Sequence, residues 1–173
     1  YWLTGYDTFG FVFFQCLVLT VKGDLILLTR TPDLRQAQNT SIINDIRIWV
    51  DKDKSNPIDD LKNILAELGL EKSKLGVEYE AYGLTGRNAI KLNSSLKDFT
   101  TLQDKSELVS HFRVIKSPAE IAYVKKAANL ADKAMEAAWE NAHAGVDESK
   151  ILSEMQGAVF KGGGDYPANE FII

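Results

Sequence analysis

The chain has 173 residues, of which 45% are hydrophobic and 25% charged, and its formal net charge is −4 at pH 7. This composition is typical of a soluble globular protein of one or two domains and excludes a largely disordered chain. The mild acidity, with no basic stripe, argues against a nucleic-acid partner, and no apolar run reaches the roughly 18 residues that would indicate a membrane span.

Up to residue 112 the chain alternates between apolar stretches typical of strands and amphipathic stretches typical of helices. Residues 11–21 and 24–30 predict a β-hairpin that turns at Lys22-Gly23-Asp24. The elements predicted next are a short helix or turn at 32–40, a strand at 46–50, a polar loop at 51–56, a helix from Pro57 to Gly69, a strand at 75–79, a helix at 84–96, a strand at 99–102 and a short helix at 106–112. This alternation predicts an α/β fold in which a mixed sheet is flanked by helices on both faces.

The chain contains one cysteine, Cys16, within the first apolar stretch. A lone cysteine cannot form an internal disulfide, so a reducing cytoplasm is the simplest location for the protein. No basic neighbour in the sequence would lower the pKa of this thiol, and we therefore do not expect Cys16 to act as a nucleophile.

Residues 113–121, RVIKSPAEI, combine the signals that begin a helix. Ser117 can accept a hydrogen bond from the backbone N–H of Glu120, Glu120 can reach back to the N–H of Ser117, and Pro118 takes the first helical position. This capping box predicts a helix of about 26 residues that ends near residues 144–145. Apolar residues spaced three and four apart predict one alanine-rich stripe that packs against a flat partner, which the preceding residues do not obviously supply: Ile121, Val124, Ala128, Ala131, Met135, Ala138 and Ala142.

A further helix is predicted after Gly145, with Ile151, Met155 and Val159 on one face, and residues 169–173 have the pattern of a beginning strand. Two helices and one strand do not complete a domain. We therefore predict one domain at residues 1–114 and an incomplete second domain at residues 115–173. Because the chain starts at Tyr1 inside an apolar stretch, without an initiator methionine, we also expect the first domain to be truncated at its front.

The first eleven residues, YWLTGYDTFGF, gather aromatic side chains in a loop punctuated by glycine. Loops that follow strand ends are where α/β proteins place ligand contacts, so these rings are candidates for an aromatic wall. The alternative is that they belong to the core or to a subunit contact, because exposed aromatic clusters also mark interfaces.

Three other patterns lack the residues that their chemistry requires. Residues 51–56 resemble the opening of a calcium loop, but Pro57 and Lys62 stand where a calcium loop needs other groups, so we expect a solvated loop. The glycines at 162–164 precede no Lys-Ser/Thr pair and predict a flexible turn. His111 and His143 lie on different elements without a second ligand at metal spacing.

Three segments together resemble the creatinase, prolidase and aminopeptidase P group of metallohydrolases, the family of the pita-bread fold. YWLTGY at residues 1–6 resembles the Tyr-Leu-Thr-Gly-aromatic signature of its N-terminal domain. RVIKSPAEI at 113–121 resembles the junction with its catalytic domain, and GVDE at 145–148 resembles the start of the next helix. The resemblance continues to GDYPA at residues 164–168, before the first catalytic-domain strand.

The resemblance implies hydrolysis of an amide or related C–N bond by a water that bridges two divalent metal ions, such as Mn, Co or Zn. Two Asp, one His and two Glu hold the metals in this family, whereas the creatinase branch works without metal. All five ligands would follow the position matched by Ile173. We therefore expect no catalytic residue, no metal ligand and no activity in this chain alone.

The resemblance also implies a homodimer in which the N-terminal domain of one subunit covers the active site of the other. Tyr6, Asp7, Phe11 and Phe13 are then the candidates for substrate contact in trans. In an alignment without gaps, Phe11 and Phe13 fall where creatinase has a Phe and a carboxylate-binding Arg. Because Phe13 cannot form that charge-assisted bond, creatine is disfavoured as a substrate.

The substrate predicted first is an Xaa-Pro dipeptide or a similar small molecule. The ectoine hydrolase branch, which opens a cyclic amidine, is a close alternative, because similar residues include WLTGYD at 2–7, Gln15-Cys16 and GGDYPA at 163–168. An alternative of another class is a non-catalytic interaction module that retains the fold without the metal ligands.

Overall fold

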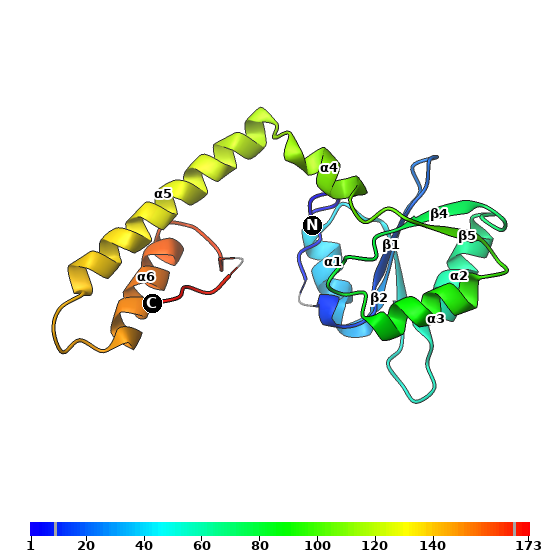
Figure 1. Cartoon of the computed structure of the whole chain (residues 1–173), viewed down its shortest axis with the longest axis horizontal. Coiled ribbons are helices and arrows are strands. Elements are labelled where there is room, and N and C mark those ends of the chain that lie inside the picture. Colours follow the sequence, from blue (N-terminus) through cyan, green and yellow to red (C-terminus); the bar gives the residue numbers. More distant parts are fainter. Residues whose placement is uncertain (9, 168) are drawn as a thin grey trace. The chain divides into compact units, whose positions relative to one another are not determined.

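The computed structural model describes residues 1–8, 10–167 and 169–173 (Figure 1). Phe9, one of the aromatic residues of the front segment, and Ala168 lie outside the described residues. The chain divides into two compact units, Tyr1–His111 and Phe112–Ile173. None of the helices in the described ranges is long and apolar enough to cross a membrane.

A three-stranded mixed sheet forms the centre of the first unit. Strand β1 (Cys16–Leu19) pairs antiparallel with β2 (Leu25–Arg30), which pairs parallel with β3 (Asp45–Trp49). The predicted hairpin is confirmed, and Gly23 adopts a φ of 92° in its turn, where side chains other than hydrogen are disfavoured.

The first strand is much shorter than the predicted residues 11–21. Its pairing with β2 begins at Cys16 opposite Leu28, and residues Gly10–Val12 instead form a 3-10 turn, η1. The reason is tertiary: the Trp49 indole Nε1 donates to the Phe14 carbonyl oxygen at 2.9 Å, so this carbonyl is bonded to a side chain. Apolar composition alone could not predict this turn.

Helices cover both faces of this sheet, as the alternating pattern predicted. On one face, α1 (Leu34–Thr40), which follows the 3-10 turn η2 (Thr31–Asp33), buries Ala37 against Leu27. On the other face, α2 (Pro57–Glu67) and α3 (Gly86–Leu96) enclose a larger core. The buried members of that core are Phe14, Val18, Ile26, Leu28, Trp49, Ile58, Leu61, Ile64, Leu65, Leu92 and Leu96.

Two further strands form a separate parallel pair, β4 (Lys74–Val77) with β5 (Thr101–Asp104). The helix α4 (Leu108–Val114) follows them and contains the division between the two units. Each of these elements occurs where the sequence predicts one, within a few residues at either end.

The second unit consists chiefly of α5 (Pro118–Asn141) and α6 (Glu148–Lys161). The predicted capping box is present at α5: Ser117 Oγ accepts from the Glu120 N–H at 3.2 Å, and the Ser117 N–H donates to Glu120 Oε2 at 2.7 Å. Asp147 caps α6 by accepting from the Ser149 N–H at 2.8 Å.

In this chain, α6 covers only one edge of the stripe predicted for α5. Ala134 is the buried residue of α5, and it packs with Met155 and Val159 of α6 and with Ala138 at the edge. Ile121, Val124 and Met135 of the predicted stripe are exposed. Alanines occur nearly all around α5, so the position of α6, rather than the spacing alone, selects the buried face.

The end of the second unit differs from prediction in two respects. Residues 169–173 form no strand, because they pair with no other strand in the described part of the chain. The glycines after α6 allow close packing: a Cβ on Gly162 would lie 2.3 Å from Leu130 Cδ2, and one on Gly164 would lie 2.7 Å from Val159 Cγ1.

Candidate functional site

The four predicted contact residues occupy different environments in the front segment. Tyr6 is 8% exposed and belongs to the core on the α1 face of the sheet. Asp7 is exposed, and its backbone N–H donates to Thr40 Oγ1 at 3.2 Å. The position of Tyr6 favours the alternative reading for this ring, as a core residue, whereas Asp7 remains open to solvent.

Phe11 and Phe13 are 45% and 41% exposed, at and just after the 3-10 turn η1. Several large apolar side chains of the first 13 residues are exposed, and we call this set the front patch: Tyr1, Trp2, Leu3, Phe11, Val12 and Phe13. The structure therefore places both phenylalanines where another molecule could contact them.

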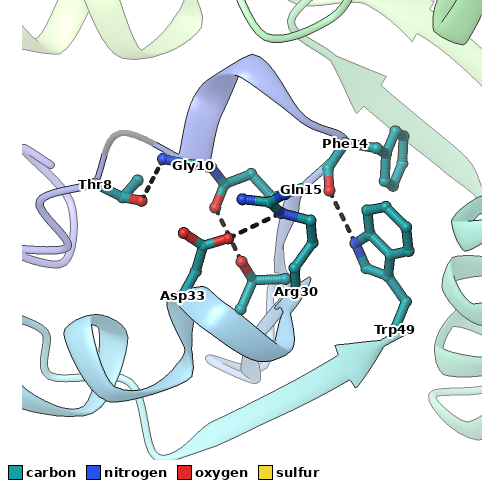
Figure 2. A network of polar contacts seen from close by, with 8 residues as sticks. Thr8, Gly10, Phe14, Gln15, Arg30, Asp33 and Trp49 are labelled. Atoms are coloured by element: carbon teal, nitrogen blue, oxygen red, sulfur yellow. Dashed lines mark hydrogen bonds and ion pairs between the residues drawn. The ribbon is translucent and has the colours of Figure 1, made fainter. Parts of the chain in front are cut away.

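Arg30 and Asp33 form a largely buried ion pair (Figure 2). Arg30 Nε donates to Asp33 Oδ2 at 3.1 Å, and the two side chains are only 15% and 11% exposed. The Arg30 guanidinium carbon also lies 3.4 Å from the centroid of the Phe13 ring, a close cation–π contact. The Phe13 ring is thus partly exposed at the surface and also in contact with the Arg30 guanidinium.

The loop before η1 comes close to the same carboxylate. The Gly10 N–H donates to Thr8 Oγ1 at 2.7 Å (Figure 2). A Cβ on Gly10 would lie 2.7 Å from Asp33 Oδ1, so the close approach of this loop to Asp33 requires glycine.

Gln15 adds a second polar group at this end of the sheet (Figure 2). Its Oε1 accepts from Thr29 Oγ1 at 3.2 Å, and Thr29 is fully buried. Its Nε2 is buried and has no hydrogen-bond partner in the described part of the chain. The site therefore contains a donor that the surrounding residues leave unused.

The groups here are suited to binding rather than to bond-breaking. Burial raises the pKa of the Cys16 thiol to about 11, so it is protonated and unreactive at neutral pH. His111 lies on α4 and His143 follows the end of α5, and both are exposed. No three His, Cys, Asp or Glu side chains of residues 1–8, 10–167 and 169–173 come together as a metal site.

Sequence reasoning missed Arg30 and Asp33 as members of this site. The available signal was TRTPD at residues 29–33, in which an arginine and an aspartate flank a proline directly after an apolar strand. That signal indicates a turn, but it does not show that Phe13, distant in sequence, would lie under the guanidinium.

The profile of the family described as the creatinase/prolidase N-terminal domain matches residues 1–115, which is most of the chain. The chain belongs to the creatinase/prolidase family. The resemblance noted from the sequence is thereby confirmed.

One curated relative of the chain is the ectoine hydrolase of Halomonas elongata. The two sequences are 30% identical over 185 residues, an alignment that covers 96% of this chain and 46% of the relative. An Xaa-Pro dipeptidase of Pyrococcus horikoshii is 26% identical and covers 78% of the chain and 38% of the relative. The chain spans less than half the length of these relatives.

Solved structures confirm the fold. The X-Pro aminopeptidase of Thermotoga maritima superposes with a TM-score of 0.72 at 18% identity, covering 93% of this chain and 42% of that one. The prolidase of Thermococcus sibiricus gives a TM-score of 0.70 at 22% identity, covering 95% and 43%. The predicted α/β architecture is thus that of the N-terminal part of pita-bread prolidases.

Proposed function

We propose that this creatinase/prolidase family chain is the N-terminal domain, residues 1–114, and the opening of the catalytic domain, residues 115–173, of a C–N bond hydrolase of the Xaa-Pro dipeptidase type. The observation that carries the proposal is the family match over residues 1–115. Likeness in fold to a prolidase and an X-Pro aminopeptidase supports it.

In this proposal the N-terminal domain joins two subunits and covers the active site of the partner. The exposed side chains of the front patch support this role, because exposed aromatic and aliphatic residues are common in interface cores. Of the residues predicted to contact the substrate, Asp7, Phe11 and Phe13 are exposed. The small-molecule or dipeptide substrate would be bound between this surface and the partner's catalytic domain.

Two divalent metal ions would lower the pKa of the attacking water and polarise the scissile carbonyl in the full-length enzyme. The residues described here do not fit such a centre, because no three potential metal ligands converge among them. We therefore assign no hydrolytic step to this chain, and we place its contribution in covering and contacting the substrate.

The full-length protein, with and without added Mn²⁺, Co²⁺ or Zn²⁺, is to be assayed against Xaa-Pro dipeptides and against ectoine. Metal-dependent cleavage of Xaa-Pro dipeptides is the expected result. Turnover of ectoine instead would establish the second candidate function, ectoine hydrolysis. The 30% identity to an ectoine hydrolase favours this candidate. No turnover of either substrate would refute both enzymes and leave the non-catalytic interaction module.

The role of the front patch is testable in the same full-length protein. Phe11→Ala and Phe13→Ala are expected to lower kcat/KM, whereas Tyr82→Ala should not, although Tyr82 is an aromatic residue with 98% exposure. A loss of stability without a change in kcat/KM would show that the two phenylalanines serve packing alone. Sedimentation of each variant would report whether the dimer is also lost.

A further inference from the structure

We draw no further inference here: the strongest candidate, the exposed apolar face of α5 that includes Ile121, Val124 and Met135, carries none because nothing in the described part of the chain shows what covers it.

Discussion

The two units of the chain are stabilised in different ways. The first buries both faces of its mixed sheet, with a large core against α2 and α3 and a smaller one against α1. In the second, the described residues form a small core of three buried apolar side chains, Ala134, Met155 and Val159, and Tyr123 and Trp139 of α5 are exposed. The difference indicates that packing dominates the stability of the first unit, whereas caps and close helix contacts matter more in the second.

The largest effect is expected from Leu28→Ala in the first unit. Leu28 is 1% exposed in the centre of β2, and truncation should cost about 3 kcal/mol of unfolding free energy through lost burial and a cavity. Leu19→Ala on β1, where the side chain is 57% exposed, should cost less than about 0.5 kcal/mol. Urea unfolding followed by fluorescence measures both, and similar losses in the two variants would contradict the burial argument.

A smaller effect is expected from Gly162→Ala in the second unit. The new Cβ would lie 2.3 Å from Leu130 Cδ2, and the forced displacement should cost about 1–3 kcal/mol. Gly157→Ala is the matched control inside α6, where the nearest atom lies at 3.8 Å, and it should stabilise by up to about 1 kcal/mol. Thermal unfolding followed by circular dichroism compares them; an unchanged Gly162→Ala variant would show that α5 can move aside.

Ser117→Ala should cost about 1 kcal/mol, because it removes the acceptor for the Glu120 N–H at the start of α5. Ser117→Asp keeps an acceptor and should remain close to wild type. Hydrogen exchange of the amides in the first turn of α5 is the direct measurement. If these amides exchange as slowly in Ser117→Ala as in the wild type, packing rather than the cap stabilises this end of the helix.

Local features were predictable from the sequence, and features that depend on distant residues were not. The capping box at Ser117 and the helix start at Pro57 depend on neighbours within one turn, and both are confirmed. The buried face of α5 depends on α6, and the Phe13–Arg30 contact joins a loop to a different strand. Tyr6 is an aromatic residue in a loop and was therefore a candidate for substrate contact, but only the fold reveals that its ring is buried.

The smallest expected effect on stability is electrostatic, and it concerns an ion pair on β3, an outer strand of the three-stranded sheet. Arg47 hydrogen-bonds Asp45 at the start of β3 and lowers the pKa of that carboxyl below its ordinary value, with charge attraction adding to the effect. The pKa of Asp45 is lower in the folded chain than in the unfolded chain. Asp45 therefore stabilises the fold at a pH above the ordinary carboxyl range, and this stabilisation is lost as the pH falls through the folded-state pKa.

Asp45→Asn should therefore reduce stability slightly at neutral pH and leave stability less dependent on pH in the acid range. The loss should be smaller than that of Ser117→Ala, because both side chains of the pair are 41% exposed and solvent screens them. Arg47→Gln should give a similar acid profile, and the double variant should add little to either single change. If Asp45→Asn still shows the full acid dependence of the wild type, that dependence must come from capping carboxylates such as Asp147, whose pKa is lowered by hydrogen bonds from Ser149 in the second unit.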